Sequence, residues 1–219
     1  MNTAKAIGEV AGKSITRALA HSTKVVPLNM PEWERWFNFK TFNDPQLMRM
    51  LEAAARFILD VRAGNRCPWQ VLVGSTNAGK THLARRCWQW WDRAGKWKKI
   101  LGKFGEANVV RSGQFVRWVD FIRECYNKDS SRADDLIDDE FVVIDDIGAG
   151  TDTRKWMADK LYAIVEHRCD APNKSTLITA NLSLEQIAAE FDPRIAGRLI
   201  RNGSDKVVNV KVPDFCLRK

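Results

Sequence analysis

The chain has 219 residues, which is enough for one domain with a sizeable buried core, and its composition is that of an ordinary globular protein. Its formal net charge of +8 favours an anionic partner such as nucleic acid, although a basic solvated surface gives the same balance. The five cysteines are widely spread and form no CxxC pair, which argues against a zinc site or a disulfide framework and favours a reducing compartment. No apolar run approaches the length of a membrane span, and no secretory signal or membrane partner is expected.

Residues 1–30 are predicted to form an N-terminal basic appendage, flexible or partner-binding, ahead of a domain at 31–219. The appendage combines small residues with scattered Lys and Arg, and Pro27 and Pro31 set it off from the rest. It is nearly free of acidic residues up to Lys24. Mitochondrial transit peptides have the same composition, so a mitochondrial location stays open as a minor alternative.

In chain order, the first expected element of the domain is a helix over 44–64. Asp44 can cap its N-terminus and Gly64 can end it, and its apolar residues recur on one helical face. Those apolar residues are Leu47, Leu51, Ala54, Ile58 and Val61. A short apolar strand at 71–73 then leads through a glycine-rich loop into a helix over 81–94.

Residues 95–113 are basic and contain glycine, which favours a loop. A strand at 115–119 and a helix at 120–126 follow, and the acidic stretch 129–140 indicates a second solvated loop. The remaining expected elements are strand 141–145, helix 153–168, strand 177–180, helix 183–191, helix 192–202 and edge strand 208–212. Strands that alternate with helices predict an α/β fold, here a parallel five-stranded sheet flanked by helices.

The glycine-rich loop carries the most specific motif of the chain. Its residues match GxxxxGK[ST] at every fixed position, between an apolar strand and a helix, and are the predicted ATP-binding residues: Gly74, Ser75, Thr76, Asn77, Ala78, Gly79, Lys80 and Thr81. Glycines let successive N–H groups turn toward phosphate oxygens, and the helix N-terminus adds partial positive charge. We expect Lys80 to reach the β- and γ-phosphates and the Thr81 hydroxyl to bind Mg²⁺.

A second motif ends the strand at 141–145, where an apolar run is followed by Asp145 and Asp146. This is the Walker B arrangement, in which Asp145 orients Mg²⁺, directly or through water. Asp146 lies where a second carboxylate can polarise the attacking water. The two motifs together predict an ATPase with ATP and Mg²⁺ as its cofactors.

The segments GSTNAGKTHLA, FVVIDDIG, TLITANLS and FDPRIAGRL, in this order, resemble the AAA+ helicase loaders of the DnaC/DnaI type and the related IstB transposition ATPases. The resemblance runs from about Phe39 to the C-terminus and implies the AAA+ form of the P-loop NTPase fold. Only a short strand follows Asn202 and Gly203, which leaves no room for a C-terminal helical lid. Both families also lack a full lid, which suggests an open site with modest turnover.

The resemblance also implies catalytic roles beside Asp146. Asn181 is similar to sensor 1, which contacts the γ-phosphate or its water; a turn residue is the alternative. Arg198 is similar to the arginine finger and Arg194 to the accompanying family arginine; a solvated helix face is the alternative. A finger acts on a neighbour's nucleotide, so the resemblance implies a homo-oligomer, a ring or a spiral, when ATP is bound.

A basic segment with interleaved tryptophans spans residues 85–103. Such a segment can follow a single DNA strand by phosphate contact and base stacking. The expected DNA contacts are Lys96, Lys98, Lys99 and Lys103. Trp88 and Trp91 are expected instead on the buried face of the helix, in the protein core.

These features predict an ATP-dependent helicase loader that assembles on a hexameric replicative helicase and single-stranded DNA. We expect slow, oligomer-dependent hydrolysis in the cytoplasm of a bacterial cell, with the chain encoded by the cell or by a phage. Two alternatives stay open: an IstB-like ATPase that assists a transposase on duplex DNA, and a nucleotide-gated adaptor with negligible turnover. A small P-loop kinase is disfavoured, because no residues suggest its lid or acceptor site.

Overall fold

The computed structural model describes residues 44–64, 68–102, 112–127, 131–148, 154–201 and 206–212, with the backbone alone for 93–102. The chain divides into two units, Met1–Asn43 and Asp44–Lys219, and the second unit holds every described residue. The expected boundary between residues 30 and 31 lies outside the described residues and stays a prediction. Among the helices of the described part, none has both the length and the apolar character needed to cross a membrane.

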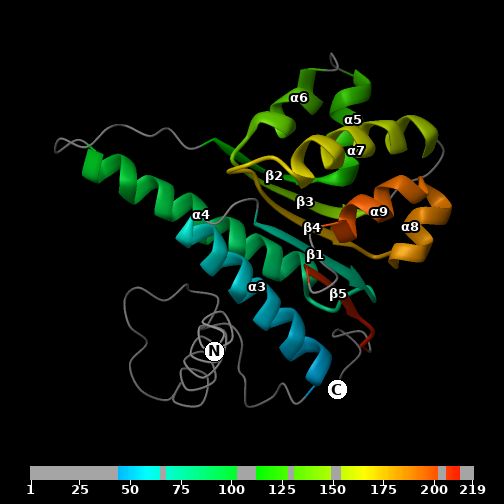
Figure 1. Cartoon of the computed structure of the whole chain (residues 1–219), viewed down its shortest axis with the longest axis horizontal. Helices are drawn as coiled ribbons and strands as arrows, with labels where there is room; N and C mark the ends of the chain where they lie inside the picture. The colour runs from blue at the N-terminus through cyan, green and yellow to red at the C-terminus, as the bar shows by residue number, and fades with distance from the viewer. Residues whose placement is uncertain are drawn as a thin grey trace, which may run out of the picture. The chain divides into compact units, whose positions relative to one another are not determined.

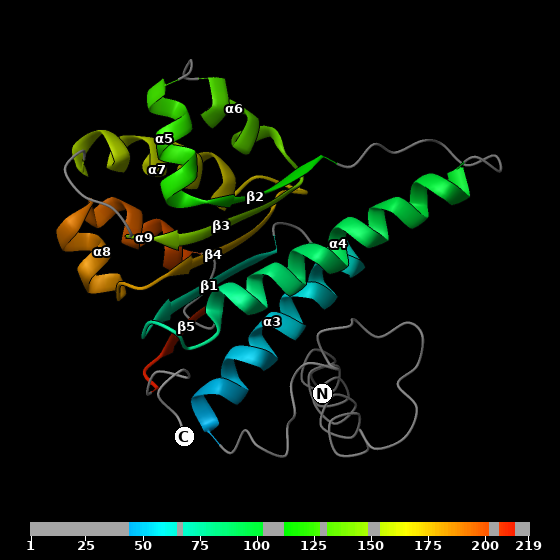
Figure 2. The ribbon, with the colours of Figure 1, turned by 180° about the vertical axis from the view of Figure 1, so that it is seen from behind.

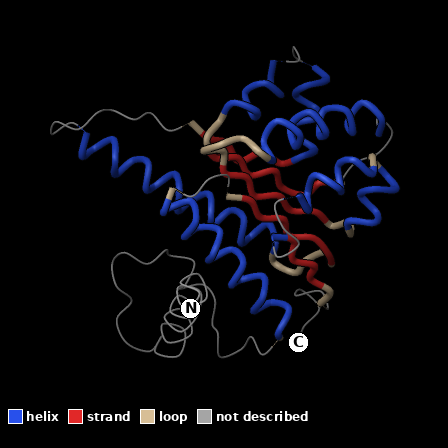
Figure 3. The backbone as a smooth tube through the Cα atoms, in the orientation of Figure 1, coloured by secondary structure: helices blue, strands red, loops and turns tan. Residues whose placement is uncertain are grey.

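The second unit is built on a five-stranded sheet in the order β2-β3-β4-β1-β5, drawn in red in Figure 3. The strands are β1 (Trp69–Gly74), β2 (Gly113–Arg117), β3 (Phe141–Ile147), β4 (Ser175–Ala180) and β5 (Val207–Val210). Every pairing is parallel, which confirms the predicted parallel five-stranded sheet. Because parallel strands end at the same edge of a sheet, the segments that follow β1, β3 and β4 meet there.

The helices cover both faces of this sheet (Figures 1 and 2). They are α3 (Pro45–Ala63), α4 (Lys80–Gly102), α5 (Trp118–Asn127), α6 (Ser131–Asp138), α7 (Arg154–Cys169), α8 (Leu184–Glu190) and α9 (Pro193–Arg201). Helices α3 and α4 lie on one face, and α5 to α9 lie on the other, where α7 packs against both α6 and α9. The carboxyl edge of the sheet therefore lies between two helical layers.

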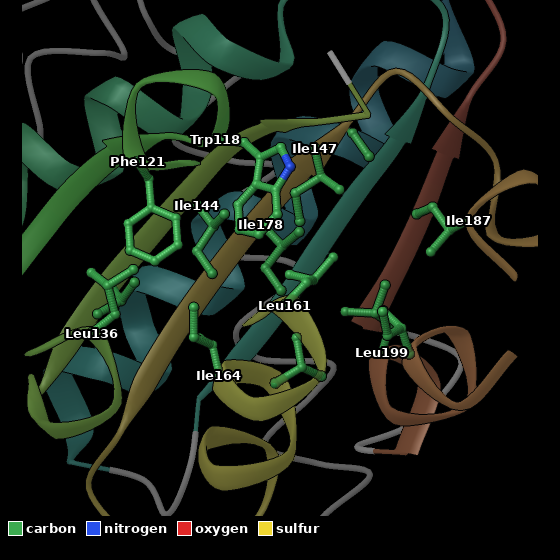
Figure 4. Close-up of a cluster of buried hydrophobic side chains, with 14 of the residues drawn as sticks. Trp118, Phe121, Leu136, Ile144, Ile147, Leu161, Ile164, Ile178, Ile187 and Leu199 are labelled. Carbon is green, nitrogen blue, oxygen red and sulfur yellow. The ribbon is translucent and has the colours of Figure 1, made fainter. Parts of the chain in front are cut away.

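Both faces of the sheet are buried, so the central strands read as continuous apolar runs. In β3, Val142 and Ile144 belong to the core under α7 and α9, and Val143 between them is also fully buried. Figure 4 shows this core, in which Trp118 and Phe121 of α5 lie near Ile144 and Ile178 of the central strands. The sequence pattern at α3 is confirmed as well, because every residue of its predicted apolar face is buried.

Helix α3 has the two caps that its sequence predicts. The Asp44 carboxylate accepts hydrogen bonds from the N–H groups of Gln46 and Leu47, at 2.8 and 3.5 Å. Gly64 ends the helix with φ 69°, the left-handed conformation that glycine adopts without a Cβ penalty.

Three expectations about local structure are wrong. Residues 95–102 continue α4 instead of forming a loop, because a single glycine at position 95 costs only about 1 kcal/mol among good helix formers. The acidic stretch contains α6, which buries Ala133 and Leu136 one turn apart on one face. Strand β2 ends at Arg117, and the fully buried Trp118 begins α5.

Candidate nucleotide-binding site

The loop between β1 and α4 turns sharply, with the backbone in the left-handed region at three positions. The φ angles are 118° at Gly74, 54° at Asn77 and 92° at Gly79. Alternation of such conformations lets successive N–H groups face a common centre. The first N–H groups of α4, from Lys80 onward, point to the same side and have no acceptor within the helix by the geometry of helices. The loop therefore has the backbone of an anion cradle.

Gly74 is required by the sheet as well as by the loop. A Cβ atom at this position would lie 2.1 Å from the backbone oxygen of Val210 in β5. The next N–H group, that of Ser75, donates to the same oxygen at 2.8 Å. The edge strand β5 thus fixes the start of the loop, and no other residue fits there without moving β5.

Lys80 extends from the first turn of α4 into the centre of the loop. Its side-chain nitrogen Nζ donates to the backbone oxygens of Gly74 and Ser75, at 3.0 and 2.6 Å. It also donates to Oδ1 of Asn181, at 2.9 Å. Asn181 directly follows β4, so this bond joins the loop after β1 to the loop after β4. The amine is held at the site where a phosphate would lie in a P-loop.

Asp145, at the end of β3, is held by a residue that sequence reasoning missed. The carboxylate is 1 % exposed, and its Oδ1 accepts from the Thr179 hydroxyl of β4 at 2.7 Å. The same hydroxyl accepts from the backbone N–H of Asp146 at 2.9 Å. Thr179 therefore fixes both acidic residues, one by its side chain and one by its backbone. The only signal in the sequence is its place two residues before Asn181, in the strand expected beside the acidic one.

Asp146 breaks the regular geometry of its strand. Its φ angle is 65°, and the pairing of β3 with β4 shifts register between Ile144 and Ile147. Successive side chains of a regular strand point to opposite faces, and a bulge re-aims one of them. Here the bulge lets Asp146 accept a hydrogen bond at Oδ1 from Nδ2 of Asn181. Two consecutive carboxylates can thus serve one site.

These groups shift each other's pKa values. Burial lowers the pKa of Lys80 to about 8, and the carboxylates of Asp146 and Asp145 oppose this shift. Burial raises the pKa of Asp146, and the negative charge of Asp145 adds to the rise. Lys80, Arg117 and the hydrogen bond from Asn181 oppose it. Groups of opposite charge with shifted pKa values, close together at one edge of a sheet, are typical of a functional site.

The residues fit ATP with Mg²⁺. The loop offers backbone N–H groups and a buried amine, and Asp145 with the Thr81 hydroxyl offers the oxygen ligands that Mg²⁺ prefers. No group of three or more His, Cys, Asp or Glu that could hold a metal occurs among the described residues. A P-loop magnesium needs none, because phosphate oxygens and water complete its shell.

Comparison with solved structures places this arrangement in a known fold. The crystal structure of DnaI is 19% identical, with a TM-score of 0.58 over 84% of this chain and 93% of that one. The DnaC helicase loader is 20% identical, with a TM-score of 0.56 over 77% of this chain and 92% of that one. This chain has the AAA+ fold of the DnaI and DnaC loaders.

The same AAA+ fold extends to a replication initiator. The structure of DnaA bound to AMPPCP and single-stranded DNA is 12% identical, with a TM-score of 0.54 over 74% of this chain and 45% of that one. No family model matches the chain, and no curated protein matches it by sequence. The likeness is therefore one of fold. In the described part of the chain, β5 is the only α-helix or strand after α9, and the expected absence of a lid stays a prediction.

Within this loader fold, the predicted finger Arg198 lies on α9, in the helical layer across the sheet from α4. Its Nη2 donates to Oε1 of Glu166 on α7 at 2.7 Å, and its Nε pairs with the other carboxylate oxygen. A hydrogen bond with the Tyr162 side chain and the charge of Glu166 raise the pKa of Arg198. Among the described residues, its partners are thus in α7 and not in the nucleotide site.

Arg194, one turn earlier on α9, is also bound within its own layer. Its Nε and Nη2 donate to both carboxylate oxygens of Asp192 at 2.8 to 3.1 Å. Its guanidinium carbon lies 4.5 Å from the centre of the Tyr162 ring, a cation–π contact. Of the four predicted catalytic residues, the structure brings Asp146 and Asn181 to Lys80, while Arg194 and Arg198 lie apart from them.

The predicted DNA contacts belong to the distal part of α4. Lys96, Lys98 and Lys99 lie on its last turns, where the backbone alone is described. Lys103 lies outside the described residues. Trp91 is buried and Trp88 is half-buried against it, with ring centres 5.2 Å apart, as expected for residues of the helix core.

Proposed function

We propose that this chain is an ATPase of the DnaC/DnaI loader type, which binds ATP with Mg²⁺ and assembles on a hexameric replicative helicase and single-stranded DNA. The observation that carries the proposal is the joined cluster of Lys80, Asn181 and Asp146, in which one amide links the phosphate-binding loop to the acidic strand end. Such a link places a phosphate-binding cation and a water-polarising carboxylate at one point. A function in replication corresponds to a cytoplasmic location in a bacterial cell.

Each residue of the cluster then has a defined task. Lys80 would exchange its backbone acceptors for the β- and γ-phosphate oxygens of bound ATP, and Thr81 and Asp145 would hold Mg²⁺, whose charge would neutralise that of the phosphates. Asp146 accepts a hydrogen bond from the attacking water, and Asn181 orients that water or the γ-phosphate. The raised pKa of Asp146 brings the carboxylate closer to the range in which it can accept a proton.

The positions of Arg194 and Arg198 support an assembly of identical subunits. Both arginines lie in the layer across the sheet from the phosphate-binding helix, bound to Asp192 and Glu166. A finger in that layer would serve the nucleotide of a neighbouring copy, in a head-to-tail ring or spiral. Hydrolysis would then depend on protein concentration and be slow in isolated subunits.

An aromatic pair with one exposed ring supports contact with single-stranded DNA. Tyr126 of α5 is 74% exposed, and its ring meets that of the half-buried Trp156 of α7 edge-on, with centres 6.3 Å apart. The ammonium of Lys160 lies 5.9 Å from the centre of the Trp156 ring. An exposed ring near a cation suits base stacking with a phosphate contact. This aromatic pair adds a second candidate DNA surface to the four lysines of residues 96–103.

The ATPase is tested by two substitutions with different expected defects. Lys80→Ala should lose most ATP affinity in calorimetry, because it removes the charge that binds the phosphates. Asp146→Asn should bind ATP with parental affinity at pH 6.5, where Lys80 is charged, yet release phosphate about a hundredfold more slowly, since it removes a general base. Lys206→Ala, which removes a half-buried lysine paired with Asp60, is the control and should do neither. Parental ATP binding by Lys80→Ala would refute the nucleotide site.

The partner is tested by capture. Immobilised chain with ATP should retain a purified hexameric replicative helicase, and retention should fail for Lys80→Ala if ATP orders the assembly. A transposase captured in place of the helicase would favour the IstB-like alternative. Helicase capture without phosphate release under any condition would favour the adaptor with negligible turnover.

A further inference from the structure

Helix α9 presents a row of three arginines to α7, and each contacts a side chain there or close by. The pairs are Arg194 with Tyr162, Arg198 with Glu166, and Arg201 with Asp170. The partners recur at four-residue spacing along α7 and just beyond its end, so they lie on one helical face. The row fixes α9 against α7 side chain by side chain.

The middle pair differs from its neighbours in geometry and burial. Nη2 of Arg198 donates a hydrogen bond to Oε1 of Glu166 at 2.7 Å, and Nε is in ion-pair contact with Oε2. The two side chains are 29% and 33% exposed, whereas those of the Arg201–Asp170 pair are 46% and 52% exposed. A charge-assisted hydrogen bond in a half-buried pair restrains the guanidinium more than an exposed pair does.

Tyr162 of α7 is a second partner of Arg198, since a hydrogen bond with its side chain raises the pKa of the guanidinium. Tyr162 and Glu166 lie one turn apart on α7, so Arg198 is held from two positions of one helical face. A guanidinium has five N–H donors, and those not used by Glu166 and Tyr162 suit phosphate oxygens.

We propose that Glu166 is the positioning residue of Arg198: it holds the guanidinium on α7, so that the arginine is already placed when it meets the nucleotide of a neighbouring copy of this chain. The inference rests on the proposed function, because it needs Arg198 to act on a neighbour's nucleotide. A long arginine side chain loses conformational entropy when it is ordered on a phosphate. If a carboxylate already orders it, that loss no longer weakens its interaction with the nucleotide. Misplacement by about 1 Å can lower a rate a hundredfold.

The test compares Glu166→Gln with the parental chain in the presence of saturating ATP. We expect the maximal rate of phosphate release to fall about tenfold or more, with the ATP dissociation constant and the midpoint of thermal unfolding unchanged. Asp170→Asn is the matched control, because it removes an ion pair with the same helix and should leave the rate unchanged. Glu166→Asp keeps the charge but shortens the reach, so its rate should lie between those of Glu166→Gln and the parent.

Two further measurements separate positioning from a structural role. The double variant Glu166→Gln/Arg198→Ala should be no slower than Arg198→Ala alone, since residues that act as one unit are not additive. Mixing Glu166→Gln with Lys80→Ala should restore phosphate release, because one interface then pairs an intact site with a well-placed finger. Mixing Glu166→Gln with Arg198→Ala should restore nothing.

The outcomes distinguish this inference from the function on which it rests. A parental rate for Glu166→Gln beside a slow Arg198→Ala overturns the positioning role and leaves the trans finger standing. A parental rate for Arg198→Ala removes the finger itself, and the inference with it. Equal thermal destabilisation and equal rate loss in Glu166→Gln and Asp170→Asn would make the row of pairs purely structural and also overturn the inference.

Discussion

The Asn181 side chain makes two hydrogen bonds of opposite direction in the candidate site. Its oxygen accepts from Lys80 and its amide nitrogen donates to Asp146. Lys80 in turn donates to two backbone oxygens of its own loop. A bound nucleotide must therefore replace hydrogen bonds that Lys80 makes within the chain. The Lys80 amine would then face phosphate charge in place of neutral oxygens.

The first prediction concerns this exchange at Lys80. With a pKa of about 8, the amine is charged at pH 6.5 and only about half charged at pH 8. Phosphate groups favour the charged form and raise the pKa, so ATP binding at pH 8 should take up about half a proton per site. Affinity should fall as the pH rises through 8. Calorimetry at one pH in buffers with different heats of protonation measures the uptake.

A variant of the neighbouring carboxylate provides the control for this prediction. Asp146 raises the pKa of Lys80, so Asp146→Asn should lower that pKa further and increase the proton uptake at pH 8. Uptake that is equal at pH 6.5 and pH 8 in the parental chain would show that Lys80 does not titrate on binding.

At the scale of single residues, the P-loop motif and the family resemblance name residues that the structure brings together. Lys80 and Asn181, far apart in the chain, meet because parallel strands end at one edge. Thr179 could not be predicted, because its role depends on the register of β4 against β3. The left-handed backbone of Asp146 could not be predicted either, because it belongs to the register shift between β3 and β4.

At the scale of elements, a buried arginine joins segments that the sequence leaves separate. Arg168, near the end of α7, is fully buried and donates from its guanidinium to five oxygens. They are the backbone oxygens of Leu136, Ile137, Asp139 and Ser175 and the hydroxyl of Thr176. The last carbonyl groups of a helix have no partner within it, and Arg168 satisfies those at the end of α6. It also fixes the start of β4.

The second prediction concerns the removal of this guanidinium. Arg168→Met keeps much of the side-chain volume but leaves the five acceptors without their donor, so the free energy of unfolding should fall by about 3–5 kcal/mol. Urea unfolding followed by tryptophan fluorescence measures the change. Arg123→Met is the control, because that side chain is 69% exposed and pairs with Asp120 only at 3.7 Å; its loss should cost less than about 1 kcal/mol. Equal stabilities of the two variants would deny Arg168 its structural role.

Helix α6, which sequence reasoning missed, depends on such distant contacts. Helix α6 is short and acidic, so its local preference is weak; it is held by two buried side chains and by Arg168 from another helix. The helix over 44–64 was predictable, because its caps and its apolar face are all local. Local signals thus predict the long, capped helix α3, whereas the formation of the short helix α6 depends on tertiary contacts.

At the scale of the whole molecule, the two helical layers carry different parts of the proposed function. One layer begins at the phosphate-binding loop and continues into the basic end of α4. The other layer holds the arginine row of α9 and the aromatic pair of Tyr126 and Trp156. A head-to-tail contact would bring the arginine row of one copy to the loop of the next. The candidate DNA surfaces lie in both layers, which allows their contributions to be separated.

The last prediction separates the two DNA surfaces by the kind of contact each makes. Replacing Lys96, Lys98, Lys99 and Lys103 together with Ala should flatten the dependence of affinity on salt, since each phosphate contact on a single strand contributes about −0.7 to the slope. Replacing Tyr126 or Trp156 with Ala should instead weaken binding by about 1–3 kcal/mol per lost stack and leave the slope nearly unchanged. Leu59→Ala on α3, which shortens another exposed apolar side chain, is the control and should have no effect. Fluorescence anisotropy with a labelled oligonucleotide over a salt series measures both quantities. An unchanged slope in the lysine variant would place the phosphate contacts elsewhere, and parental affinity in both aromatic variants would exclude stacking at the aromatic pair.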